Sequence, residues 1–146
     1  MSSILSQFQS IGRELFLRGL ISSHGGNMSI RWGRRLVITR HGCMLGQLTE
    51  RDLVETGIDE DDEATAQAST ELEVHRSIYK TTDSQAVMHA HPPHAVALSL
   101  KRDAIVPCDV EGRLSLQRVP VVGNGMKLKS GELADDIARE IKDNVA

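Results

Sequence analysis

The chain contains few aromatic residues and few cysteines. Aromatic residues make up 3% of its 146 residues, which is too few for the stacking platforms that bind single-stranded nucleic acid. The two cysteines, Cys43 and Cys108, lie far apart and form no CxxC pair, so a disulfide scaffold is excluded. Such sparse cysteine is typical of a reducing compartment, and we expect a cytoplasmic protein.

The chain also lacks an excess of basic charge and a long hydrophobic run. Lys and Arg number 17 against 20 Asp and Glu, so bulk electrostatics do not predict a nucleic-acid partner. No apolar run approaches the roughly 20 residues that cross a bilayer, and the opening MSSILSQFQSIGREL lacks the pattern of a secretory signal. With 40% hydrophobic residues, residues 1–146 are expected to form a single domain with a normal core.

Helix-like and strand-like patterns alternate along the chain. Ile4, Phe8, Ile11 and Leu15 recur at helical spacing near the start, and the later alternation favours an α/β layered domain. The acidic stretch 59–66 is expected to be a solvated loop. The predicted helices are residues 3–20, 69–81, 94–103 and 130–146, and the predicted strands lie within 22–32, 34–40, 49–58, 86–91 and 112–123.

A cluster of histidines occupies the stretch AVMHAHPPHAV. His89 and His91 are two residues apart in a predicted strand, so both imidazoles point to the same face. Such a pair suits a divalent metal, and catalytic zinc typically takes three protein ligands and leaves one position open. The alternative is a polar role at the end of a strand that Pro92 terminates. His94 follows the prolines and is expected to face elsewhere.

Two segments could hold an anion such as a phosphate group. Residues 22–29, SSHGGNMS, contain glycines that let backbone N–H groups approach a phosphate. Residues 68–71, ASTE, open a predicted helix, where free N–H groups and hydroxyls favour phosphate. The simpler interpretations are an ordinary turn, and helix capping by Ser69 or Thr70. Glu71 is then either a cap carboxylate or a catalytic base.

These segments occur together and in order, and the chain resembles the class II aldolase/adducin family, within it the fuculose-1-phosphate aldolase branch. The resemblance spans residues 19–100 and continues in VPVVGNGMKLKSGELADDIAREI. It implies a three-layer α/β/α fold, in which helices flank a central, mainly antiparallel sheet. The matching segments are GLISSHGGNMSIR, LVITRHG, LTERDLV, STELEVHRSIYK and AVMHAHPPHAVALS.

The resemblance also implies a metal-dependent aldolase. Members cleave a ketose 1-phosphate to dihydroxyacetone phosphate and an aldehyde. A divalent metal, zinc before manganese or cobalt, acts as the Lewis acid. By this resemblance His89 and His91 supply two metal ligands, and Glu71 is the acid/base that shuttles the proton. The positions that match phosphate-binding residues of the family are Asn27, Gly42, Ser69 and Thr70, with Gly26 and Thr39 beside them, and His41 is a further candidate phosphate contact.

The chain departs from the family pattern in two places. The family often has Thr-Pro-Ser/Thr-Gly where this chain has TRHG at 39–42, so His41 replaces a small hydroxyl near the phosphate. In the family a third metal histidine follows the last helix, within a His-Gly pair, whereas no histidine occurs here after His94. We therefore expect the native chain to continue beyond Ala146.

Two alternatives to an aldolase stay open. Pentulose-5-phosphate 4-epimerases and methylthioribulose-1-phosphate dehydratases of the same fold share the histidine pair. Adducin-like domains are non-catalytic interaction modules; the presence of His89, His91 and Glu71 argues against this alternative, and the missing third histidine argues for it. Because family members commonly form tetramers, the resemblance also implies a homo-oligomer. The expected partner is a small-molecule sugar phosphate, and no nucleic-acid or membrane partner is expected.

Overall fold

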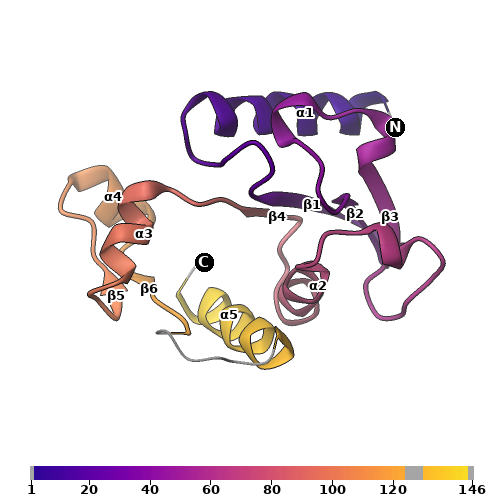
Figure 1. Ribbon diagram of the computed structural model, residues 1–146. Helices are drawn as coiled ribbons and strands as arrows, with labels where there is room; N and C mark the ends of the chain where they lie inside the picture. Colours follow the sequence, from indigo (N-terminus) through magenta and orange to yellow (C-terminus); the bar gives the residue numbers. More distant parts are fainter. Residues whose placement is uncertain (1, 124–129, 145–146) are drawn as a thin grey trace.

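The computed structural model describes residues 2–123 and 130–144, and a four-stranded sheet lies at its centre (Figure 1). The strands are β1 (Asn27–Trp32), β2 (Arg35–Thr39), β3 (Leu53–Gly57), β4 (Ala86–His89), β5 (Ala104–Ile105) and β6 (Val119–Pro120). The central sheet has the order β3-β2-β1-β4, and every neighbouring pair in it is antiparallel. β5 and β6 form a separate two-stranded sheet.

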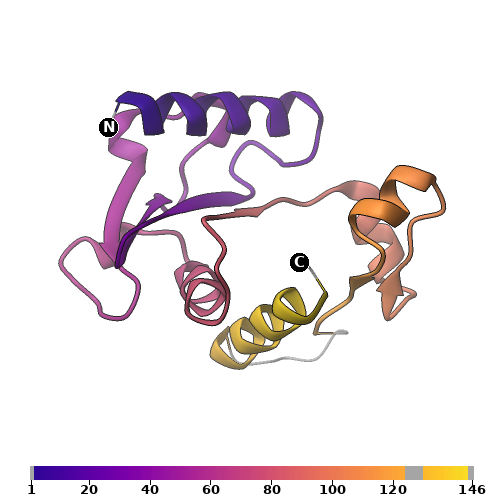
Figure 2. The ribbon, with the colours of Figure 1, turned by 180° about the vertical axis from the view of Figure 1, so that it is seen from behind.

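Helices cover both faces of the central sheet. The helices are α1 (Ser2–Leu17), α2 (Leu72–Thr81), α3 (Pro93–Ser99), α4 (Val110–Ser115) and α5 (Ser130–Asn144). α1 lies across one face and α2 across the other, and α5 packs against α2 (Figures 1 and 2). None of the described helices is long and apolar enough to cross a membrane. The predicted α/β fold, a mainly antiparallel sheet flanked by helices, is confirmed.

The alternation of side chains along β1 separates an apolar set from a polar set. Met28 and Ile30 pack into the core cluster beneath α1. Asn27, Ser29 and Arg31 point the other way, where they hydrogen-bond to groups of α2. This polar stripe crosses an otherwise apolar core on the α2 side of the sheet. The buried residues of that core are Leu36, Ile38, Val54, Ile58, Ala68, Leu72 and Tyr79.

The first helix ends three residues before its predicted boundary. α1 stops at Leu17, and Gly19 adopts a left-handed conformation with φ of 65°. The Gly19 N–H donates to the Phe16 carbonyl and the Leu20 N–H to the Leu15 carbonyl, both at 3.0 Å. These two bonds are typical of a helix that ends at a glycine, and they satisfy carbonyl groups in the last turn of α1.

Two local predictions are wrong. Neither Ser69 nor Thr70 caps α2, because the N-cap position belongs to Glu71, which makes no side-chain cap bond. Part of the segment 112–123 is helical rather than extended, because α4 begins at Val110. The Asp109 carboxylate accepts the Gly112 N–H at 2.7 Å and caps this helix.

The acidic stretch 59–66 is a loop up to Ala64, as predicted, and its last two residues begin a short 3-10 helix, η3 (Thr65–Gln67). The loop also binds two arginines. Asp62 accepts a hydrogen bond from the Arg35 guanidinium at 2.8 Å, and Asp61 accepts one from Arg76 at 2.6 Å. The Arg76 side chain is only 6% exposed, so its charge requires these partners. These hydrogen bonds therefore anchor the acidic loop to β2 and α2, so the loop is not merely solvated.

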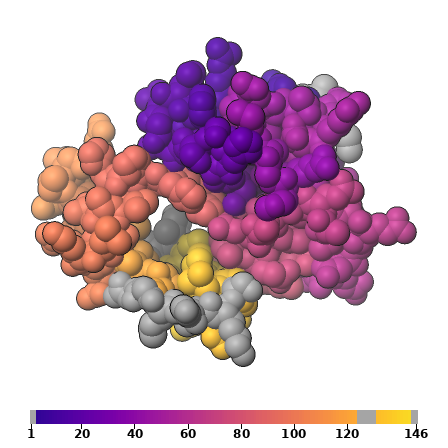
Figure 3. Space-filling view, in the orientation of Figure 1, coloured from indigo at the N-terminus to yellow at the C-terminus, as the bar shows by residue number. Residues whose placement is uncertain are grey.

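Between β4 and α5 the chain leaves the central sheet. α3, β5, α4 and β6 lie beyond the edge of β4, and on the face seen in Figure 3 they stand apart from the body formed by α1 and the sheet. Several of their apolar side chains are exposed, including Leu100 at 80% and Leu114 at 77%. This region contributes none of the buried residues of the two core clusters.

Candidate active site

The predicted site residues converge on one polar pocket of about 340 Å³ at the end of the central sheet. Thr39 is the exception, since it is fully buried and its hydroxyl accepts the Met28 N–H at 3.1 Å. His94 does not line the pocket either; it lies exposed in α3. The lining residues are His24, Gly25, Gly26, Asn27, Arg40, His41, Gly42, Cys43, Ser69, Thr70, Glu71, His89 and His91.

The pocket forms where the start of β1 and the ends of β2 and β4 meet the start of α2. The approach to β1 requires glycine at position 26, whose φ is 78°. A Cβ atom there would lie 2.7 Å from the His89 carbonyl oxygen and 2.8 Å from the Ile21 side chain. A side chain at position 26 would therefore push β1 away from the histidine-bearing strand.

The two histidines lie next to each other in the pocket. β4 ends at His89, so His91 lies outside the strand, and its backbone N–H donates to the Leu20 carbonyl at 2.8 Å. The imidazoles nevertheless converge, with their Nε2 atoms 3.0 Å apart. The predicted shared direction thus holds, although the backbone that produces it is not a continuous strand.

This geometry fits one divalent metal ion. Two nitrogens bound to one tetrahedral zinc ion at about 2.0–2.1 Å lie about 3.4 Å apart, close to the observed separation. The Nδ1 atom of His89 contacts the Glu71 carboxylate and lies 3.2 Å from the Asn27 amide nitrogen, which leaves Nε2, the atom beside His91, as the one that would bind a metal. Carboxylates commonly orient metal-binding histidines in this way. Among the described residues, no group of three His, Cys, Asp or Glu side chains forms a complete metal site.

Glu71 stands at the start of α2 and faces the histidines. Its Oε2 atom contacts His89 and accepts a hydrogen bond from the Asn27 amide at 3.1 Å. The hydrogen bond with His89, followed by that with Asn27, lowers the pKa of Glu71 to about 2. The group is therefore an ionised carboxylate near neutral pH.

Sequence reasoning missed a cation in this pocket. Arg40 follows β2 and lines the pocket, and its charge acts on the Cys43 thiol, which also lines it. None of the ion pairs between described side chains involves Arg40. The stretch TRHG contains the signal, since an arginine replaces a proline beside the predicted phosphate site.

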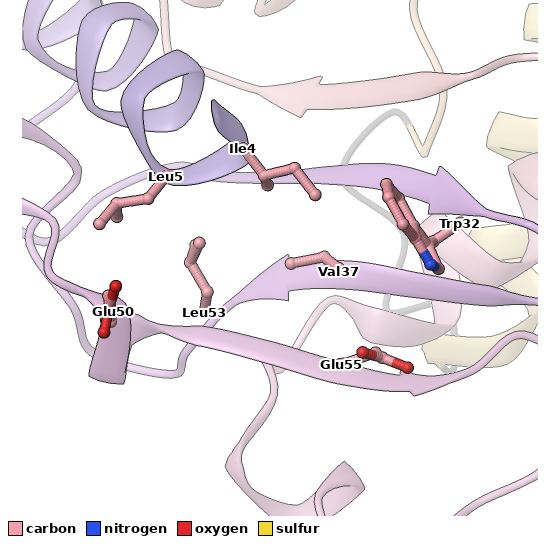
Figure 4. Close-up of a pocket in the computed structure, with 7 residues that line it drawn as sticks. All are labelled: Ile4, Leu5, Trp32, Val37, Glu50, Leu53 and Glu55. Atoms are coloured by element: carbon pink, nitrogen blue, oxygen red, sulfur yellow. The ribbon is translucent and has the colours of Figure 1, made fainter. Parts of the chain in front are cut away.

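A second pocket lies between α1 and the sheet, and its chemistry is different. It measures about 150 Å³, and Figure 4 shows Ile4, Leu5, Val37 and Leu53 facing its interior. Glu50, Glu55 and Trp32 complete the lining, and the Glu55 carboxylate already pairs with Arg35 at 2.6 Å. This pocket has no histidine and no converging donors, so the polar pocket is the candidate active site.

Residues 6–146 match the family described as Class II Aldolase and Adducin N-terminal domain. The chain belongs to this family. Its structure aligns with that of L-fuculose-1-phosphate aldolase from Thermus thermophilus with a TM-score of 0.88 and 36% identity, covering 99% of this chain and 74% of that one.

Two curated relatives of this class II aldolase family member have different descriptions. An L-fuculose phosphate aldolase of Methanococcus maripaludis is 30% identical over 97% of this chain and 78% of that protein. A probable bifunctional methylthioribose-1-phosphate isomerase/methylthioribulose-1-phosphate dehydratase of Nocardia farcinica is 32% identical over 68% of this chain, a match that spans only 18% of that longer protein. Class II aldolases generally depend on a divalent metal, which agrees with the paired imidazoles of this chain.

Proposed function

We propose that this protein is a metal-dependent lyase of the class II aldolase type. It would reversibly cleave a ketose 1-phosphate, such as fuculose 1-phosphate, to dihydroxyacetone phosphate and an aldehyde. The observation that carries this proposal is the ionised Glu71 carboxylate beside the converging imidazoles of His89 and His91. The two aldolase relatives support the same reaction.

His89 and His91 would hold the metal, most suitably zinc, with manganese or cobalt as other candidates. A bound divalent ion supplies Lewis-acid stabilisation of the negative charge that develops on the substrate oxygens. The third protein ligand would come from outside the described residues. As in other family members, the active enzyme would be a homo-oligomer, with a tetramer as the expected assembly.

Glu71 would move the proton. Cleavage breaks the bond between the dihydroxyacetone phosphate fragment and the aldehyde, and it leaves an electron pair on the three-carbon fragment. The hydroxyl that becomes the aldehyde carbonyl loses its proton as this bond breaks, and the carbon of the three-carbon fragment gains one, so the net reaction moves one proton from oxygen to carbon. In the synthetic direction that carbon loses a proton and the aldehyde oxygen gains one. Glu71 lines the pocket at the start of α2, and its carboxylate can add and remove the proton as general acid and general base.

The phosphate group would bind to other residues that line the same pocket. The loop after β2 contributes His41 and Gly42 there, and the approach to α2 contributes Ser69 and Thr70. Thr39 would act only by holding the end of β2, given its buried hydroxyl. The remaining proposed contacts are Gly26 and Asn27, although the Asn27 side chain already bonds to other residues of the pocket.

Arg40 is expected to strengthen phosphate binding. Replacing it, as Arg40→Gln, should raise the KM for the sugar phosphate about tenfold, because a hydrogen bond to a charged group contributes about 1.5 kcal/mol or more. Competition by inorganic phosphate should weaken in parallel. Arg51→Gln is the matched control, since Arg51 is exposed nearby but does not line the pocket. Equal KM values for the Arg40→Gln and wild-type proteins would contradict this role.

The Nocardia relative favours a second candidate, dehydration of methylthioribulose 1-phosphate. Product analysis distinguishes it from the aldolase reaction and from 4-epimerisation of a pentulose 5-phosphate. Zinc-loaded protein should release dihydroxyacetone phosphate from fuculose 1-phosphate. Turnover only of methylthioribulose 1-phosphate or ribulose 5-phosphate would reject the aldolase proposal, and turnover of none would favour an adducin-like interaction module.

A further inference from the structure

A buried chain of polar side chains joins β1 to α2 behind the candidate active site. His75 is 1% exposed, with its Nε2 atom 2.5 Å from the Asn27 Oδ1 atom and its Nδ1 atom 2.6 Å from the Ser29 hydroxyl. The same hydroxyl lies 2.7 Å from the Tyr79 phenol. Beyond Asn27, the amide nitrogen reaches the Glu71 carboxylate at 3.1 Å. Five side chains therefore form one continuous line of hydrogen bonds.

The periodicities of the two elements create this line. Asn27 and Ser29 are two residues apart in a strand, so they share a face. Glu71, His75 and Tyr79 are spaced by four residues at the start of and along a helix, so they lie in a row. The two rows interleave because β1 and α2 pack face to face across the core on that side of the sheet.

The Glu71 carboxylate at one end of this line of hydrogen bonds fixes which group donates and which accepts at each step. An ionised carboxylate only accepts hydrogen bonds, so the Asn27 atom that faces Glu71 must be its amide nitrogen. The Asn27 oxygen then faces His75, and it requires a proton on the His75 Nε2 atom. A neutral imidazole with a proton on Nε2 has a bare Nδ1, which must accept the Ser29 hydroxyl proton.

The far end of the chain agrees with this direction. Because the Ser29 proton is engaged by His75, the Ser29 oxygen accepts the Tyr79 phenol proton. The backbone of Val87 also hydrogen-bonds to this phenol, and the Arg31 guanidinium lies 5.1 Å from the ring centre. Burial lowers the pKa of His75 to about 4, so its imidazole is neutral near pH 7.

We propose that His75 is a positioning residue, held as its Nε2–H tautomer by the Ser29 hydroxyl, and that it fixes the Asn27 amide so that its nitrogen donates to Glu71. Without this hold, the Asn27 amide could rotate and present its oxygen to the carboxylate. His75 therefore decides which Asn27 atom faces the Glu71 carboxylate, without itself touching substrate. The effect on turnover rests on the proposed lyase function, whereas the tautomer does not.

The tautomer is measured directly by long-range ¹H–¹⁵N spectra of protein labelled at histidine. His75 should show a protonated Nε2 and a bare, hydrogen-bonded Nδ1 near pH 7, and its signals are assigned by their loss in His75→Gln. Ser29→Ala should shift the Nδ1 resonance toward that of an unbonded ring nitrogen. Tyr79→Phe, the matched control, removes only the far donor and should leave the tautomer unchanged. A proton on Nδ1, or a cationic His75, would overturn the proposal.

The kinetic arm compares two replacements of His75. His75→Leu removes the donor to Asn27 and should lower kcat about 10- to 100-fold, the range seen when a partner of a site residue is lost. His75→Gln keeps an N–H that can reach Asn27 and should recover most of that loss. Equal losses in both folded variants would overturn the positioning role. If the wild-type protein cleaves no sugar phosphate, the proposed function fails, and the spectra still decide the tautomer.

Discussion

Glu71→Gln should lower the rate of retro-aldol cleavage by about 10²- to 10⁴-fold, the usual contribution of a positioned acid/base. Glutamine has almost the same shape, and its carbonyl oxygen can still accept the hydrogen bonds from Asn27 and His89. It cannot accept and return a proton at neutral pH. Bound metal, measured by elemental analysis, should therefore stay at the wild-type ratio while turnover falls.

The matched control for Glu71→Gln is Glu73→Gln. Glu73 lies two residues away, is 60% exposed at its side chain and, among the described residues, forms an ion pair only with Arg76. Both changes remove one negative charge from the same part of the molecule, but only one removes a carboxylate from the pocket. Full activity in Glu71→Gln would exclude Glu71 from the proton transfer, and an equal loss in Glu73→Gln would point to a general electrostatic effect.

His89→Ala should abolish stoichiometric metal binding and lower turnover on the order of 10³-fold. Lewis-acid stabilisation contributes several kcal/mol, and each 1.4 kcal/mol corresponds to a factor of ten. His89 also contacts Glu71, so its removal leaves the carboxylate without its principal partner. Zinc titration by calorimetry and the lyase assay measure the two effects separately.

His94→Ala is the control for the metal prediction. It removes a histidine from the same short stretch, but His94 is exposed in α3 and lies outside the pocket. Zinc affinity and turnover should therefore match the wild-type values. Retention of tight zinc binding in His89→Ala, or its loss in His94→Ala, would show that the histidines have been assigned to the wrong roles.

Local patterns were sufficient to predict an α/β layered domain, whereas the resemblance to the family supplied the mainly antiparallel sheet and most of the candidate site residues. The alternation of β1, the helical spacing of α1 and the glycines before Asn27 are short-range features, and each is visible along the chain itself. Local patterns failed where two conformations were equally compatible with the residues. At α4 the decisive feature was the Asp109 cap rather than the alternation of apolar residues. At α2 the Ser69 hydroxyl accepts the Glu71 N–H in the turn before the helix, and the N-cap position falls to Glu71.

The hydrogen bonds behind the candidate active site, and the arginine beside it, could be identified only from the tertiary structure. His75, Ser29 and Tyr79 have no individual signature of function, because their roles depend on the packing of β1 against α2. Arg40 became a candidate phosphate ligand only when the end of β2 was placed at the pocket. Such contacts join residues dozens of positions apart, and no short sequence window contains both partners.

The stretch AVMHAHPPHAV illustrates the division. The sequence by itself determined that His89 and His91 are close together, and it predicted a strand through His91 that Pro92 would terminate. Only the tertiary structure decided that His91 leaves the strand, that its backbone is held by Leu20, and that both Nε2 atoms still converge beside Glu71. The physical reason is that covalent spacing limits how far apart two side chains can lie, whereas packing decides where they point.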